Sequence, residues 1–122
     1  MRKCRLGFLI GLLFFSVVML PATAQSLHVS AKVENHTPDA WALVTVPLVN
    51  SSSFVRWCVP PGGSSQKWID GDFHYARVLA VDSSCIDRGL HYFREDVPLF
   101  RHEHFTLILS GSHGHYSVHG HH

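Results

Sequence analysis

Apolar and polar residues alternate along much of this chain. In residues 26–34 every second position is apolar, namely Leu27, Val29, Ala31 and Val33. A period of two places successive side chains on opposite faces, as in a β-strand with one face against a core. Residues 26–34 are therefore predicted to form a strand.

The same pattern predicts further strands, separated by turns rich in Gly, Pro, Asn and Ser. They cover residues 41–49, 54–59, 66–69, 73–81, 105–109 and 115–119. Pro47 marks an edge or a bend, because proline cannot donate to a sheet ladder. Residues 87–102 fit neither period and are expected to form a short helix or an irregular excursion. Six to eight short strands indicate an all-β fold, a small antiparallel β-sandwich or partly open barrel.

The N-terminal segment has a different pattern. Its first residues are basic, and an almost unbroken apolar run follows over residues 6–20, shorter than the roughly 20 residues that span a bilayer. Ala22-Thr23-Ala24 then supplies the small-x-small pattern of a signal peptidase site. We predict a cleaved signal peptide over residues 1–24. Residues 25–122 are then a single secreted or periplasmic domain with no stable membrane insertion.

Processing would change the cysteine count. Cys4 leaves with the signal peptide, so that Cys58 and Cys85 remain. An even pair in an oxidising compartment predicts a disulfide, which we expect to pin the two sheets of the sandwich. Processing also removes three cations from a chain of net charge +1, which leaves about −2 with neutral histidines. That balance argues against nucleic acid as a partner.

Histidine is the outlier of the composition, with 11 in all and most of them near the C-terminus. Imidazole is a common ligand of zinc, copper and nickel. If the last hairpin closes with Ser110 opposite His115, its apolar residues share the core face. The same register pairs Thr106 with His119 and His104 with His121. The predicted metal-binding group on the outer face is His102, His104, His119 and His121. A solvated terminal segment without a role, or with weak adventitious binding, is the alternative.

Catalytic motifs are missing from the sequence. It contains no H-E-x-x-H helix, no G-x-S-x-G elbow and no phosphate-binding glycine loop, so we predict a protein that is not an enzyme and requires no cofactor. Two triplets match the N-glycosylation pattern, Asn35-His36-Thr37 and Asn50-Ser51-Ser52. Most aromatic residues, Tyr92 among them, are expected in the core. Trp68 follows a Pro/Gly/Ser loop and is predicted as a ligand contact.

Two functions fit these features best, and a secreted hydrolase whose carboxylates and histidines are assembled from distant positions is a minor third. The first is a non-catalytic binding module for a partner protein, including an enzyme to be inhibited, or for a glycan at the cell envelope. The alternative is a periplasmic buffer or chaperone for zinc, copper or nickel, using the C-terminal histidines. The hairpin that carries those histidines distinguishes the two.

Overall fold

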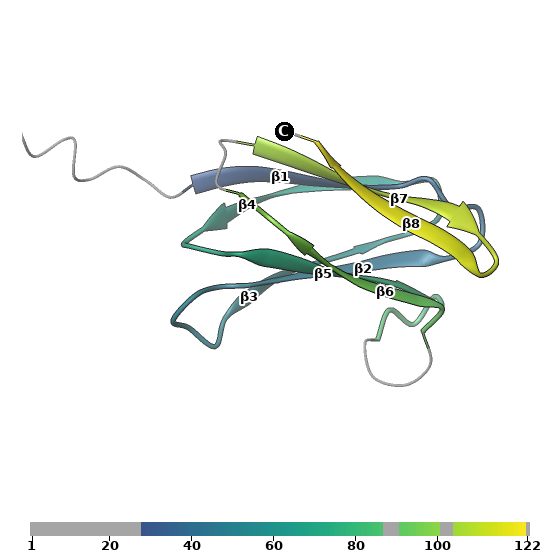
Figure 1. The fold of residues 1–122 in the computed structure, drawn as a ribbon, viewed down its shortest axis with the longest axis horizontal. Coiled ribbons are helices and arrows are strands. Elements are labelled where there is room, and N and C mark those ends of the chain that lie inside the picture. Colours follow the sequence, from purple (N-terminus) through teal and green to yellow (C-terminus); the bar gives the residue numbers. More distant parts are fainter. Residues whose placement is uncertain (1–27, 87–90, 101–103, 122) are drawn as a thin grey trace, which may run out of the picture.

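The computed structural model describes residues 28–86, 91–100 and 104–121. These residues form eight strands and no helix, arranged as two stacked four-stranded sheets (Figure 1). The predicted all-β sandwich is therefore confirmed. The predicted signal peptide and His102 lie outside the described residues. Within the described ranges no helix has the length and hydropathy of a membrane span.

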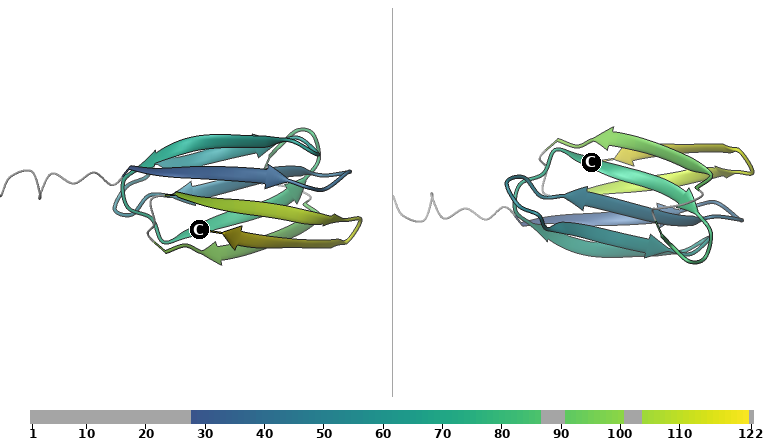
Figure 2. Two further views of the ribbon diagram at one scale, coloured as in Figure 1. Left: turned by 90° about the horizontal axis from the view of Figure 1, so that it is seen from above. Right: turned by 90° about the horizontal axis from the view of Figure 1, so that it is seen from below.

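The first sheet has the strand order β4-β1-β7-β8, and the left view of Figure 2 looks onto it. Its strands are β1 (His28–Asn35), β4 (Ser64–Asp70), β7 (His104–Ser112) and β8 (His115–His121). Strands β1 and β7 are parallel, whereas the other neighbours are antiparallel. The first and last strands of the described chain, β1 and β8, therefore belong to one sheet and lie on either side of β7.

The second sheet has the order β3-β2-β5-β6, with every neighbouring pair antiparallel (Figure 2, right). Its strands are β2 (Trp41–Pro47), β3 (Phe54–Val59), β5 (Tyr75–Val81) and β6 (Phe93–Pro98). Pro47 pairs with β3 beyond the point where the pairing with β5 stops, so β2 is locally an edge there. Strand β6 corrects the expectation of a helix or an irregular excursion in residues 87–102.

The core lies between the inner faces of the sheets. Alternate residues of β1, namely Val29, Ala31 and Val33, are buried, as their period of two predicted. Phe73 meets Phe105 across the core with ring centroids 5.9 Å apart. Each fully buried Val, Leu or Phe side chain stabilises the fold by roughly 1.5–3 kcal/mol.

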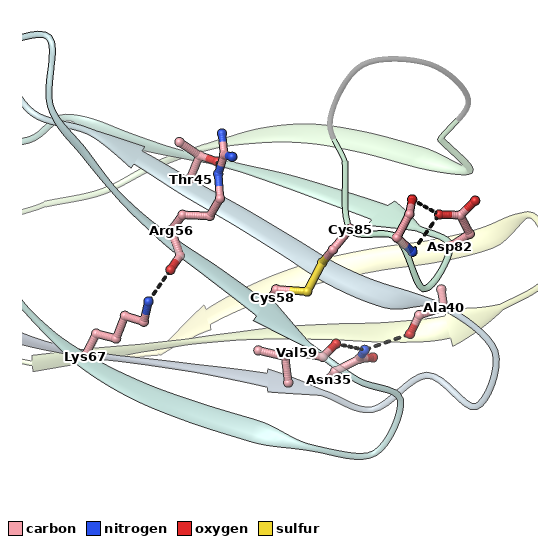
Figure 3. Close-up of a disulfide and its surroundings, with 10 residues drawn as sticks. Asn35, Ala40, Thr45, Arg56, Cys58, Val59, Lys67, Asp82 and Cys85 are labelled. Carbon is pink, nitrogen blue, oxygen red and sulfur yellow. Dashed lines mark hydrogen bonds between the residues drawn. A yellow bond between two sulfur atoms is a disulfide. The ribbon is translucent and has the colours of Figure 1, made fainter.

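The disulfide joins Cys58 of β3 to Cys85 in the connection after β5 (Figure 3). The predicted pairing is confirmed, but its predicted place between the two sheets is wrong, because β3 and β5 belong to the same sheet. Cys85 packs against a small cluster of Leu43, Leu79 and Val81. The bond therefore holds the connection after β5 over the second sheet. Closing a loop with a sequence separation of 27 stabilises the fold by about 3.5 kcal/mol on the chain-entropy model.

Candidate functional site

The turn between β7 and β8 is tighter than the sequence pattern predicted. Ser112 lies opposite His115, and only His113 and Gly114 connect them. Both residues have positive φ angles, 25° and 77°, as a two-residue type I′ hairpin turn requires. The predicted register, with Ser110 opposite His115, is wrong by two residues. Because side chains alternate with a period of two, this shift leaves every side chain on its predicted face.

The shift changes which residues the histidines face. His121 pairs with Thr106 and His119 with Ile108, and the ladder does not extend to His104. His104, His119 and His121 are exposed. Among the described residues no group of three or more His, Cys, Asp or Glu side chains is arranged to hold a metal ion. His102, the fourth member of the predicted group, lies outside those residues.

Gly111 allows the two strands to pair closely at the base of this turn. It lies opposite Tyr116 and has a φ of +104°. A Cβ atom at this position would lie 2.0 Å from the carbonyl oxygen of His115. A residue with a side chain could not occupy Gly111 without moving the backbone of β8. Gly111 therefore allows the backbone of β7 to approach the backbone of His115 and Tyr116 closely.

Asp39, in the connection between β1 and β2, binds this hairpin. Its Oδ2 accepts the backbone N–H of His113 at 3.0 Å, and its Oδ1 accepts the hydroxyl of Tyr116 at 3.0 Å. A pocket of about 280 Å³ opens beside these hydrogen bonds. It is lined by Asp39, Tyr92, His113, Gly114 and Tyr116. We call it the tyrosine–aspartate pocket.

Packing and backbone hydrogen bonds hold the two tyrosines. Tyr92 donates its backbone N–H to the carbonyl of Ala80 at 2.8 Å, directly before β6 begins. Its residue surface is nevertheless 49% exposed. Tyr116 packs against Phe93, with ring centroids 6.2 Å apart. The pocket is therefore bordered by one firmly packed tyrosine and one whose side chain is half open to solvent.

The surroundings of Asp39 and Tyr116 shift their pKa values in opposite directions. The pKa of Asp39 is lowered, chiefly by the hydrogen bond from the His113 backbone. The pKa of Tyr116 is raised, first by burial and then by the bond to Asp39. Asp39 is therefore an anion and Tyr116 a neutral donor. The Nδ1 of His113 lies 3.5 Å from Oδ2 of Asp39, so that a protonated His113 would pair with it.

Sequence reasoning missed this pocket, and it placed Tyr92 in the core. Asp39 lies 74 residues from His113 and 77 from Tyr116 along the chain. Nothing local to either segment predicts that they meet. The sequence His113-Gly114 could have predicted the hairpin turn, because glycine at the second position of a two-residue turn is typical of type I′. That reading would have given the true register and extended the hairpin.

A buried amide, Asn35, lies at the end of β1, directly before the same β1–β2 connection. Its Nδ2 donates to the carbonyls of Ala40 at 2.8 Å and Val59 at 3.0 Å (Figure 3). Its Oδ1 accepts from the backbone N–H and the hydroxyl of Thr37. The amide nitrogen has no hydrogen left and no surface exposed, so the glycosylation match at Asn35 is excluded in the folded protein. Asn50 is exposed, and its match stays a prediction.

Trp68 lies on the outer side of β4, at the far end of β1 from Asn35. It is 55% exposed, and its ring stacks on His28 with centroids 4.5 Å apart and planes inclined by 13°. His28 in turn bonds to Asp70 through Nδ1. An exposed, ordered tryptophan suits a ligand contact, and this role stays a prediction.

Comparison with known proteins adds little to this description. No protein-family model matches the chain, and no curated protein does. Among solved structures, a trapped toxin aligns with 76% of the chain at 8% identity and a TM-score of 0.45. A disulfide-locked mutant of intermedilysin with human CD59 aligns with 76% at 7% identity and a TM-score of 0.42. The chain spans about a quarter of the length of each. Similarities this distant carry no argument about function.

Proposed function

We propose that this chain is a non-catalytic, extracytoplasmic binding module that contacts a protein or glycan partner through the tyrosine–aspartate pocket. The pocket itself is the observation that carries the proposal. Ligand sites are typically concave, with aromatic walls and a few fixed polar groups. Here the polar group is Asp39, held by two hydrogen bonds, and the aromatic residues are Tyr92 and Tyr116. Tyrosine is also enriched among the residues that dominate binding energy.

The chemistry of the pocket favours binding over catalysis. A general base works best when its pKa lies near the working pH. The pKa of Asp39 is lowered instead, by donors that stabilise its anion. Among the described residues that line the pocket there is no cysteine, serine or lysine to act as a nucleophile. These features support recognition as its role.

The extracytoplasmic location is supported by two features. The predicted signal peptide directs export, and a disulfide persists in oxidising compartments. Detecting the protein outside the cytoplasm, shortened at Ala24, would test this part of the proposal. Retention of the full-length chain in the cytoplasm would contradict it.

Partner capture tests the binding role. The exported protein, purified without an affinity tag and immobilised, is incubated with envelope extract and separately with a glycan array. We expect a ligand whose capture falls when Tyr92 is replaced by alanine. The matched control is Phe54→Ala, which removes an aromatic residue that is 51% exposed at the opposite end of β2. Equal loss in both variants, or no pocket-dependent ligand, would refute the proposal.

Metal buffering by zinc, copper or nickel is the second candidate function. One observation favours it: His119 and His121 are both exposed on one side of the edge strand β8. Elemental analysis of untagged protein from its natural compartment would show bound metal in this case. Calorimetric titration would then show weaker affinity in His119→Ala/His121→Ala, with the exposed His74→Ala as control. A metal-free protein whose affinity does not depend on His119 and His121 would exclude this candidate.

A further inference from the structure

We infer that the tyrosine–aspartate pocket receives a cationic side chain of a partner protein, the guanidinium of an arginine or the ammonium of a lysine. This inference rests on the proposed function and specifies the chemistry of its partner. Three features of the pocket carry it: an anion with unused hydrogen-bonding capacity, two tyrosines beside that anion, and a volume that suits one side chain.

The anion is Asp39. A carboxylate has about four acceptor positions. In Asp39 the His113 N–H occupies a position on Oδ2 and the Tyr116 hydroxyl occupies one on Oδ1. The side chain is still 25% exposed and lines the pocket. Both donors are neutral groups. The lining residues that the structure describes include neither lysine nor arginine, and the basic group among them is His113, whose Nδ1 lies 3.5 Å from Oδ2 of Asp39. A ligand that carries N–H donors and a positive charge would satisfy the remaining acceptor capacity.

The tyrosines add a second attraction for a cation. An aromatic face draws a cation that lies within about 6 Å of the ring centre, most strongly when water is excluded. Tyr92 and Tyr116 both line the pocket. An arginine side chain would combine this attraction with charge-assisted hydrogen bonds to Asp39, which are roughly twice as strong as neutral ones.

The size and position of the pocket favour a side chain over a larger ligand. Its volume of about 280 Å³ lies just below the range of roughly 300–1,000 Å³ that holds drug-sized ligands. It opens beside the hairpin turn, where the His113 side chain is 94% exposed. A folded partner could reach this turn without rearranging either sheet. Anionic ligands are disfavoured, because Asp39 would repel them.

Nuclear magnetic resonance of the exported, untagged protein tests the inference with two peptides of the same shape. One is acetyl-Gly-Arg-Gly-amide, and the other carries citrulline, the neutral analogue of arginine. We expect the arginine peptide to shift the amide signals of Tyr92, Gly114 and Tyr116. We expect the citrulline peptide to bind about tenfold more weakly, because it lacks the charge.

Substitutions identify the groups that bind. Asp39→Asn should weaken binding of the arginine peptide about tenfold, and Tyr92→Ala about threefold. Phe54→Ala should leave the affinity unchanged. If Asp39→Asn disturbs the hairpin, its spectrum will show this, and the comparison between arginine and citrulline in the unaltered protein still decides the question.

The outcomes separate this inference from the proposed function. Equal affinity for the arginine and citrulline peptides would overturn the cationic ligand. If partner capture nevertheless depends on Tyr92, the pocket binds by neutral contacts and the proposed function stands. If neither peptide binds and capture does not depend on Tyr92, both proposals fall.

Discussion

Asn35 and Asp39 lie four residues apart where β1 turns into β2, and the surroundings of their polar side chains differ. Asn35 is fully buried, and its amide makes four hydrogen bonds. Asp39 makes two hydrogen bonds and lines an open pocket. The last residue of β1 thus makes all its side-chain hydrogen bonds within the fold, whereas Asp39 in the following connection keeps acceptor capacity for a ligand.

The difference also shows what holds the two sheets together at this end. Asn35 is the last residue of β1 in the first sheet, and Val59, whose carbonyl it binds, is the last residue of β3 in the second (Figure 3). The disulfide was predicted to bridge the sheets, but a buried amide makes this connection. Asp39 instead ties the loop to the β7–β8 hairpin. Asn35 therefore fixes the β1–β2 connection to the second sheet, and Asp39 fixes it to the hairpin.

The largest expected effect comes from Asn35→Ala. The substitution leaves the Val59 carbonyl and the Thr37 backbone N–H without this partner, whereas the Ala40 carbonyl keeps the hydroxyl of Thr37 at 2.9 Å. Each orphaned buried group costs about 1–3 kcal/mol, so we expect the free energy of unfolding to fall by about 4 kcal/mol. Urea unfolding measures this, and Asp39→Ala is the comparison, with a much smaller expected loss because its carboxylate lines an open pocket. Equal losses of unfolding free energy in Asn35→Ala and Asp39→Ala would contradict the conclusion that Asn35 contributes more to the stability of the fold than Asp39 does.

Glycine substitutions in the hairpin should have the next largest effect. Gly111→Ala places a Cβ against the His115 backbone at a φ of +104°, and we expect a loss of about 3 kcal/mol. Gly114→Ala meets no atom within 4 Å, so only its left-handed φ costs energy, about 1 kcal/mol. Thermal or urea unfolding compares them. Equal costs would mean that the close backbone approach at Gly111 does not contribute to the stability of the β7–β8 hairpin that Asp39 binds.

Local patterns predicted most strands correctly, and the exceptions have physical causes. Strand β6 (Phe93–Pro98) was missed because it is an edge strand whose polar residues are exposed in succession, without a period of two. The register of the last hairpin was missed because His113-Gly114 was taken as part of a longer loop. In both cases the apolar pattern was too weak to determine which backbone groups pair.

The candidate site was less predictable, because it depends on contacts distant in sequence. The count of cysteines was enough to predict that Cys58 pairs with Cys85. That the bond lies over a single sheet depends on the strand order, which places β3 and β5 in the same sheet. Asp39 meets His113 and Tyr116 only because β1 and β7 are parallel neighbours. A single sequence does not encode that adjacency in any local pattern.

A smaller effect is expected in the pH dependence of the free energy of unfolding of Asp39→Asn, which tests the bonds between Asp39 and the hairpin. The pKa of Asp39 lies below its ordinary value of 3.8 in the folded protein. The carboxylate therefore contributes stability above pH 3.8, and this contribution is lost as the pH falls through the lowered pKa. We expect the stability difference between wild type and Asp39→Asn to be constant near neutral pH and to vanish in acid.

Urea unfolding at a series of pH values measures that difference. Asp82→Asn is a control of the same kind, because Asp82 also has a lowered pKa, caused by local hydrogen bonds from Ser84. Both variants should show the acid-dependent loss, but only Asp39→Asn should also shift the amide signal of His113. A stability difference that does not vary with pH would contradict the assignment of Asp39 as an anion bound by the hairpin.

Tyr92→Ala should change stability least and binding most selectively. The residue is 49% exposed and is anchored through its backbone N–H, which alanine retains. We expect the free energy of unfolding to stay within about 0.5 kcal/mol of wild type, while capture of the partner falls. A stability loss as large as that of Asn35→Ala would place Tyr92 with the residues that hold the fold. A loss of binding without a loss of stability would show that the pocket can be altered for recognition while the hydrogen bonds of Asn35 maintain the sandwich.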